Sequence, residues 1–295
     1  MSKLQWRNLW AGLAFTSPFL LGFLALTLYP LFASFYYSFT SYKILTPPQW
    51  IGLGNYTQMV RDELFWTAIS NTLLYTAMAV PAQLVVAFAL ALALNAKIRG
   101  LTIYRTLFYL PSLVPLVAVS ILWLWLFHTR FGLINVALQA IGLPRLGWLT
   151  NPTLAKPSLV LMSLWGIGPT IVIYLAGLQD VPQQLYEAAE LDGASWLQKI
   201  RFVTLPMMTP VILFTLIIGL IDSFQYFTQV YIMTSGGPVN ATLMYVIYLY
   251  DNAFRYIEMG YASGLAWILF LVVLLCTLLI LRTSARWVYY GGETQ

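Results

Sequence analysis

The segment from residue 187 to residue 206 reads EAAELDGASWLQKIRFVTLP and lies between two long apolar runs. We expect a short helix over its first part, ended by Gly193, because a residue without a side chain permits a sharp turn. A second amphipathic piece, Trp196 to Val203, is expected to lead back to the next apolar run. Small residues flanked by carboxylates suit a surface that seats in another protein.

The composition around this segment indicates a lipid environment. The chain has 295 residues, of which 60% are hydrophobic, 16% aromatic and 8% charged, and its mean hydropathy is +0.77. Soluble domains carry about 25% charged residues, so this chain has too little charge to solvate a globular surface in water. A large buried helical core in a soluble protein is excluded on the same ground. The sequence therefore predicts an all-α membrane protein.

Six apolar stretches are long enough to cross a bilayer, which takes about 20 residues of helix. The fifth stretch is read as one span because Ser235 to Pro238 breaks it and the segment after it is too short and polar to cross. Residues 131–144 fit an interfacial segment. The expected spans cover about 10–39, 68–95, 105–127, 157–179, 207–234 and 260–281, in a single domain of residues 1–295 with one connector at 180–206.

Prolines fall inside several of these spans. Each frees a backbone carbonyl that lipid cannot satisfy, so it must face protein or a wetted path, and kinked helices around a cavity are implied. Asn71 and Thr72 are expected to cap the second span. The prolines in question are Pro18, Pro30, Pro81, Pro111, Pro115, Pro169 and Pro210.

Basic residues set the expected orientation. Six spans place both termini on one side, and that side carries nine Lys and Arg residues against six on the other. The positive-inside rule then puts both termini in the cytoplasm. The first apolar run is too long for a signal peptide, so no cleavage is expected. The nine residues are Lys3, Arg7, Lys97, Arg99, Arg105, Lys199, Arg201, Arg282 and Arg286.

Two motifs resemble a known family, the permease subunits of binding-protein-dependent ABC importers, in the carbohydrate branch of the maltose and glycerol-phosphate permeases. The first is Glu187-Ala188-Ala189 with Gly193 four residues later and Leu205-Pro206; Val203 stands where isoleucine is usual. The second is Met233 to Pro238 followed by Ala241-Thr242. The likeness covers roughly residues 10–285. It implies a type I ABC importer permease fold, multi-pass in the bacterial inner (plasma) membrane.

In this family the connector is the coupling helix that docks onto a nucleotide-binding subunit. The resemblance therefore implies that one set of residues couples the chain to an ATPase. The set is Glu187, Ala188, Ala189, Asp192, Gly193, Leu205 and Pro206.

A candidate solute site centres on Asp222, about midway along the fifth span. A carboxylate at that depth costs at least ~2.5 kcal/mol, so it should face the bundle interior. On a continuous helix Asp222, Tyr226 and Gln229 share one face, and Trp165 on the fourth span offers an aromatic platform. The resemblance places a sugar site on the same two helices, although most residue types there differ from better-known members. The predicted substrate-binding residues are Trp165, Gly166, Thr170, Gly219, Asp222, Ser223, Tyr226 and Gln229.

The chain itself carries no P-loop, so hydrolysis is expected on a partner. We expect no catalytic residue, metal or cofactor in this chain, with ATP and Mg²⁺ on the partner ATPase. The resemblance implies a second homologous permease subunit, an ATPase dimer and an extracytoplasmic solute-binding protein; lipid surrounds the spans and no nucleic acid is expected. Import would proceed by alternating access.

Several alternatives stay open at this point. The chain could be an ABC permease for another small polar solute, although no arginine lies inside a span, away from its ends, to hold a phosphate. A secondary transporter would share the hydropathy but would not need a docking connector. A membrane enzyme would need a catalytic cluster, and the sequence has one histidine, His128. Asp222 could also bond a neighbouring helix or the second permease subunit instead of solute.

Overall fold

The computed structural model describes residues 2–96 and 100–289. Lys97 and Arg99, two of the basic residues used to predict orientation, lie outside the described residues. The chain divides into two compact units, Met1–Asp62 with Leu249–Phe270, and Glu63–Tyr248 with Leu271–Gln295. The single domain expected from the sequence stays a prediction.

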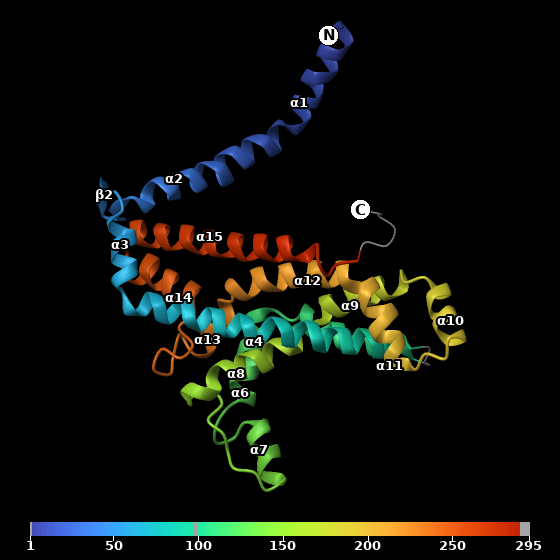
Figure 1. Ribbon diagram of the computed structural model, residues 1–295. Coiled ribbons are helices and arrows are strands. Elements are labelled where there is room, and N and C mark those ends of the chain that lie inside the picture. The colour runs from blue at the N-terminus through green and yellow to red at the C-terminus, as the bar shows by residue number, and fades with distance from the viewer. Residues whose placement is uncertain (1, 97–99, 290–295) are drawn as a thin grey trace. The chain divides into compact units, whose positions relative to one another are not determined.

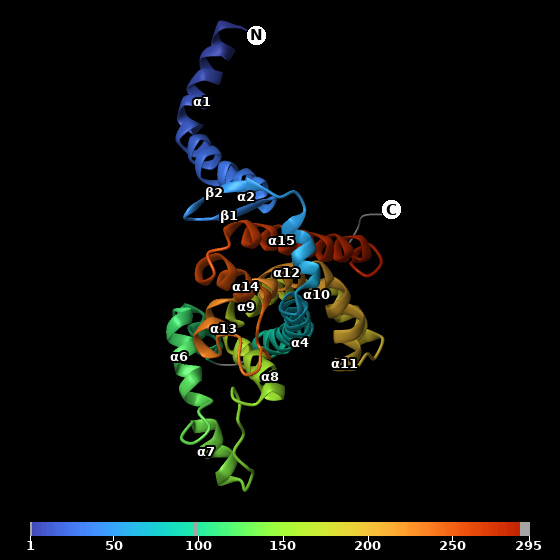
Figure 2. The same ribbon diagram turned by 90° about the vertical axis from the view of Figure 1, so that its left-hand side faces the viewer.

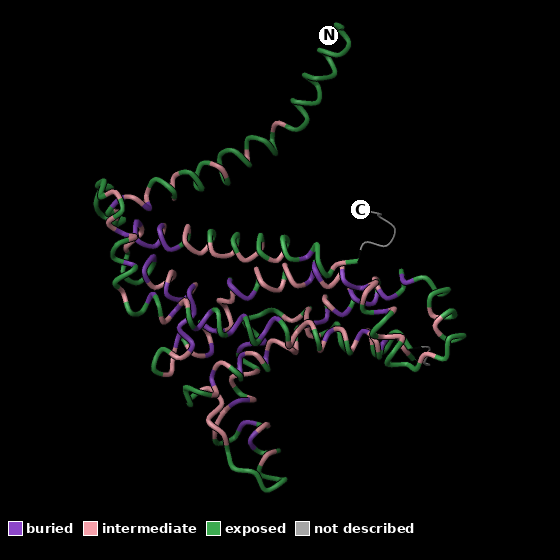
Figure 3. The backbone as a smooth tube through the Cα atoms, viewed as in Figure 1, coloured by how far each residue is buried: buried purple, intermediate pink, exposed green. Residues whose placement is uncertain are grey.

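The first unit is built around an N-terminal helix that is almost entirely exposed (Figure 3). A five-residue π-helical turn, Leu24–Leu28, joins α1 to α2, so that the three form one candidate span from Lys3 to Ser38. A small antiparallel sheet, which was not predicted, pairs Thr40 with Trp50. The elements are α1 (Lys3–Phe23), α2 (Tyr29–Ser38), β1 (Thr40–Lys43), β2 (Thr46–Trp50), α3 (Gly54–Arg61), the π-helix Asp251–Arg255 and the start of α15 (Met259–Ser284).

The second unit is helical throughout its regular structure. Its long helices α4, α9 and α12 lie side by side (Figure 1), and α13 lies beside α6 (Figure 2). Its elements are α4 (Glu63–Leu94), α5 (Leu101–Tyr109), η2 (Leu110–Leu113), α6 (Leu116–Leu126), α7 (Leu133–Ala140), α8 (Pro152–Ser163), η3 (Leu164–Gly166), α9 (Gly168–Gln179), α10 (Gln183–Leu191), α11 (Trp196–Lys199), η4 (Ile200–Thr204), α12 (Leu205–Phe224), α13 (Thr228–Met233) and α14 (Tyr245–Tyr250).

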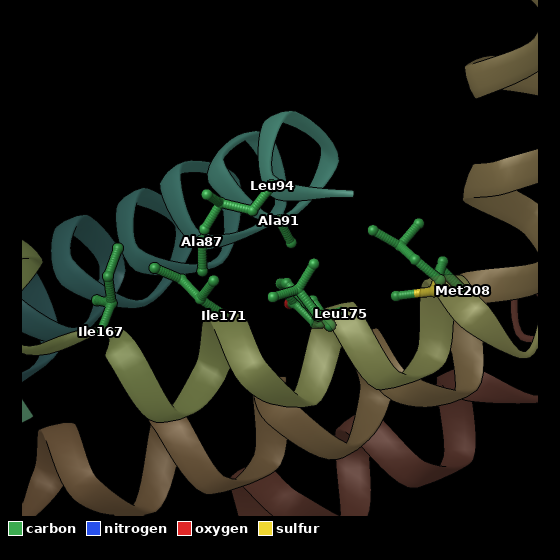
Figure 4. Close-up of a cluster of buried hydrophobic side chains, with 9 residues drawn as sticks. Ala87, Ala91, Leu94, Ile167, Ile171, Leu175 and Met208 are labelled. Carbon is green, nitrogen blue, oxygen red and sulfur yellow. The ribbon is translucent and has the colours of Figure 1, made fainter. Parts of the chain in front are cut away.

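Small residues allow these helices to pack closely. Ala87 and Ala91 of α4 are fully buried against Ile171 and Leu175 of α9 (Figure 4). Helices in a membrane gain little from the hydrophobic effect and depend on such close packing. The core of the second unit therefore lies where α4, α9 and α12 meet.

The described helices agree with the predicted fold class. Four are long and apolar enough to cross a membrane, and two bent pairs raise the number to six if each pair is one span. The pairs bend by 98° between Leu113 and Leu116 and by 53° between Gly166 and Gly168. Pro115 and Pro169 lie at these breaks, so the expectation of kinked helices is confirmed. The limits of the spans and the side on which the termini lie stay predictions.

Two local expectations were wrong. Asn71 and Thr72 do not cap the second span, because α4 begins at Glu63 and buries both in its interior. The helical register that would place Asp222, Tyr226 and Gln229 on one face is lost, because α12 ends at Phe224 and α13 begins at Thr228. The expectation that the piece beginning at Trp196 leads back to the next apolar run is confirmed, since α11 and η4 continue directly into α12.

Candidate solute cavity and docking helix

A cavity of about 620 Å³ lies within the second unit. Residues of α4, α6, α8, α9, α12 and α13 line it, together with the breaks between them. These segments are distant in the sequence, and the fold brings them together around the cavity. All eight predicted substrate-binding residues line this one cavity: Trp165, Gly166, Thr170, Gly219, Asp222, Ser223, Tyr226 and Gln229.

Asp222 lies in the last turn of α12 and is exposed. Within residues 2–96 and 100–289, its carboxylate takes part in none of the ion pairs, which join Lys43 to Glu258, Lys199 to Glu190 and Arg255 to Asp251. A carboxylate at this depth needs hydrogen-bond donors from elsewhere. The described part of the chain leaves Asp222 free to accept them from a solute or from a second subunit.

The break after Phe224 brings Tyr226 against α4. The Tyr226 ring stacks on Tyr75, with ring centroids 4.7 Å apart and an angle of 14° between planes. Such an offset pair adds about 0.5–1.5 kcal/mol beyond the area it buries. The aromatic pair forms part of the cavity lining. Tyr226 reaches Tyr75 because α12 ends before Tyr226.

The bend between α8 and α9 supplies another part of the lining. Trp165 and Gly166 belong to the short 3₁₀ turn at this bend, where irregular backbone is tolerated because it lines a cavity. Trp165 packs edge-on against Trp123 of α6, with centroids 6.3 Å apart. A Cβ added at Gly166 would meet no atom within 4 Å, and at Gly219 only the Val80 Cγ1 at 3.8 Å. Both glycines keep the cavity wide.

Sequence reasoning missed several polar lining residues. They carry hydroxyl and amide groups that suit a hydroxylated solute, but a single polar residue in an apolar run gives no signal of the direction it faces. The missed polar residues are Tyr75, Gln83, Ser112, Ser163 and Thr215, and Gln225 and Thr228, which neighbour Asp222 in the sequence, also line the cavity.

The connector forms a helix with a defined end. The Gly193 amide donates to the Glu190 carbonyl at 3.0 Å and the Ala194 amide to the Ala189 carbonyl at 2.9 Å, with Gly193 at φ +74°. These two bonds make a Schellman motif, which favours glycine because only glycine adopts the left-handed conformation without cost. The predicted end of the helix at Gly193 is therefore confirmed.

Side-chain contacts hold this helix against the start of α12. The Tyr186 hydroxyl lies 2.9 Å from the Thr204 Oγ1, and the Lys199 Nζ donates to the Glu190 Oε1 at 2.7 Å. Ser195 and Gln198 form a capping box at the start of α11. The connector is thus two helices joined by a turn and held by these side-chain contacts. The sequence did not predict the contact between Tyr186 and Thr204.

Most of the predicted coupling residues are exposed on this element. Glu187, Ala188, Asp192 and Gly193 are exposed and Ala189 is half-buried, all within α10 and its end. Leu205 and Pro206 lie apart from them, in the first turn of α12. Apolar side chains also extend outward here, and Leu191 is 90% exposed. Exposed apolar residues beside carboxylates mark an interaction surface.

Helices long and apolar enough to cross a membrane, a cavity whose lining includes a carboxylate with hydroxyl and amide groups, and an exposed helix in the connector are together typical of a membrane transport protein. The chain belongs to the family described as "Binding-protein-dependent transport system inner membrane component", which matches residues 83–288. It is therefore a multi-pass inner-membrane permease subunit.

Similar proteins agree with this family. The chain is 44% identical to "Probable ABC transporter permease protein YesP" of Bacillus subtilis (strain 168), over 97% of this chain and 94% of that protein. It is 34% identical to "Arabinooligosaccharides transport system permease protein AraP" of the same organism, over 98% and 93%. It also resembles a solved bacterial ABC transporter involved in the import of the acidic polysaccharide alginate, with a TM-score of 0.83, 25% identity and coverage of 96% and 99%.

Proposed function

We propose that this chain is the transmembrane subunit of an ATP-driven importer that moves a sugar or sugar-like polyol across the inner membrane by alternating access. The observation that carries the proposal is the cavity of about 620 Å³ lined by Asp222, Trp165 and a set of hydroxyl and amide side chains. The names of the relatives, an arabinooligosaccharide permease and an alginate importer, support a saccharide as solute.

The residues of the cavity have separable roles in this proposal. The Asp222 carboxylate accepts hydrogen bonds from two sugar hydroxyls, and charge-assisted bonds of this kind are about twice as strong as neutral ones. Trp165 packs its ring on the apolar face of the sugar. Ser223, Gln229 and Thr170 supply further polar contacts, and Gly166 and Gly219 leave room for the ring.

Energy reaches this site from outside the chain. In the proposal α10 docks onto a nucleotide-binding subunit through Glu187, Ala188, Ala189, Asp192 and Gly193, and ATP with Mg²⁺ is bound and hydrolysed there. The chain itself is not an enzyme. A second homologous permease subunit completes the pathway, and an extracytoplasmic solute-binding protein delivers the sugar. The exposure of α10 and its contacts with the segment before α12 support this role, because a docked helix that contacts a span can transmit motion to it.

Uptake by the complete importer in proteoliposomes tests the role of Asp222. A panel of saccharides is first offered with the solute-binding protein to find the one that is transported. Asp222→Leu should then abolish its uptake while the complex assembles normally, and Asp222→Asn should retain part of it through its amide oxygen. Normal uptake by Asp222→Leu would remove Asp222 from the solute site.

A secondary transporter is the competing function, and α10 argues against it because such a transporter has no use for an exposed docking helix. The same proteoliposomes separate the two. Uptake should require ATP on the ATPase side and persist with a protonophore, whereas uptake driven by an ion gradient without ATP would overturn the importer proposal.

A further inference from the structure

A second cavity, of about 210 Å³, lies between α4, α5 and α9 and shares no lining residue with the solute cavity. Apolar side chains form most of its walls, among them Leu94, Phe108, Ile171, Val172 and Leu175. Gly168 also lines this pocket, and a Cβ there would lie 2.9 Å from the Phe108 carbonyl oxygen. The close approach of α5 and α9 thus depends on a glycine.

One cation lines this apolar pocket. Arg105 of α5 is half-buried, and its Nη2 donates to the Leu94 carbonyl, at the end of α4, over 3.3 Å. Its Nε is buried and makes no hydrogen bond to any described residue. No carboxylate within the described ranges forms an ion pair with it. A guanidinium has five N–H donors, so most of its hydrogen-bonding capacity is unused.

Arg105 is half-buried, and a cation that is partly withdrawn from water is costly without a counter-ion, so proteins tend to pair such charges. The outer face of α5 suits lipid, since Ile103 and Leu107 beside Arg105 are exposed. Arg105 is also among the basic residues that the positive-inside rule assigns to the cytoplasmic surface, where the leaflet is anionic. A guanidinium binds phosphate oxygens in pairs. The missing anion is therefore best supplied by a molecule that joins a phosphate to an apolar chain.

We propose that this pocket binds an anionic phospholipid, with the lipid phosphate on Arg105 and an acyl chain along Phe108 and Val172, the exposed apolar residues of its wall. The site lies beside α9, and Thr170 of the same helix lines the solute cavity. A bound lipid would fill the gap between α4, α5 and α9 and hold these helices together. This inference does not depend on which solute is transported.

Native mass spectrometry of the assembled transporter tests the site. The complex is titrated with dioleoylphosphatidylglycerol, with dioleoylphosphatidylcholine, or with the first lipid in the presence of inorganic phosphate. Wild type should retain one phosphatidylglycerol, and Arg105→Gln should weaken its retention about fivefold, the effect of one basic residue at an anionic leaflet. Arg105→Lys should keep most of it. Phosphatidylcholine should be lost, and inorganic phosphate should not displace the lipid.

Two further variants keep the test decisive. Arg282→Gln removes an exposed basic residue of α15 and should leave retention unchanged. Val172→Trp leaves Arg105 unchanged and fills the pocket from a half-exposed position, so this variant should also lose the lipid. If the complex with Arg105→Gln does not assemble, the Val172→Trp variant alone tests the proposal. Equal retention by wild type and both pocket variants would overturn the proposal. Displacement by inorganic phosphate, equal binding of phosphatidylcholine, or an equal loss in Arg282→Gln would overturn it as well.

Discussion

Asn71 shows how one polar side chain can organise a distant loop. Its Nδ2 donates to the carbonyls of Asn240 at 2.7 Å and Leu243 at 3.1 Å, and its Oδ1 accepts from the Lys156 Nζ at 2.7 Å. The neighbouring Thr72 Oγ1 accepts from the Tyr245 amide at 2.8 Å. Asn71 thereby ties the loop before α14 to the interior of α4, and no signal in the sequence indicated this role.

Replacing Asn71 by Leu should destabilise the protein. The change leaves two carbonyl groups and an ammonium group without their hydrogen-bond partner. Each buried group that stays unsatisfied lowers the free energy of unfolding by about 1–3 kcal/mol. Thermal unfolding in detergent should show a clear fall in midpoint. Leu74→Ala, at an exposed position on the same helix, serves as the control and should change the midpoint far less; equal shifts would contradict the assigned role.

Gly193 provides a single-residue test of the proposal that α10 docks onto a nucleotide-binding subunit. A non-glycine residue at φ +74° costs about 1–2 kcal/mol, and no atom lies within 4 Å of an added Cβ, so strain and not a clash is the cause. Gly193→Val should disrupt the end of α10 and reduce uptake per ATP hydrolysed. Gly193→Asn, which tolerates this conformation, should keep the two rates coupled. If both variants transported and hydrolysed normally, the docking assignment would be wrong.

Broken helices decide where the cavity lies. The bend at η3 presents Trp165 and Gly166, and the interruption between α12 and α13 turns Tyr226 onto Tyr75. A straight helix at either position would place these residues differently around its axis. The cavity is thus a product of the two interruptions as much as of the residue types.

Filling the cavity at the bend should block transport without harming the fold. Gly166→Leu adds a side chain into open space, and a misfit of one methylene in a pocket is worth about 1–3 kcal/mol, or tenfold and more in rate. Uptake should fall in the order wild type, Gly166→Ala, Gly166→Leu, with larger saccharides affected first. Assembly of the complex is the control; unchanged uptake by Gly166→Leu would place the solute path elsewhere.

At the level of the whole molecule, the positions of the helices alone do not determine how the chain is oriented across the membrane. The distribution of Lys and Arg predicts that both termini are cytoplasmic. Green fluorescent protein fused to the C-terminus should fluoresce, and alkaline phosphatase fused there should be inactive. The reverse activities after fusion to the α7 region, 133–140, serve as the control. An active phosphatase at the C-terminus would invert the predicted topology and the placement of α10.

The amino-acid sequence by itself determined the class of this protein. A charge content of 8% and long apolar runs leave lipid as the only solvent that suits the chain, and the segment 187–206 carries the family's docking motif. It also named eight residues that prove to line one cavity, in part because a carboxylate in an apolar span must face inward and in part because the family resemblance places a sugar site on the same two helices. Their contact with solute stays a prediction.

Only the tertiary structure decided how these residues meet. Local propensity could not reveal that α12 stops at Phe224, since the ring of Tyr226 finds its partner, Tyr75, on a helix far away in sequence. Nor could it show that Arg105 is left beside an apolar pocket or that Asn71 is buried inside α4. Such features arise from contacts between segments distant in the chain, which a pattern of neighbouring residues does not encode.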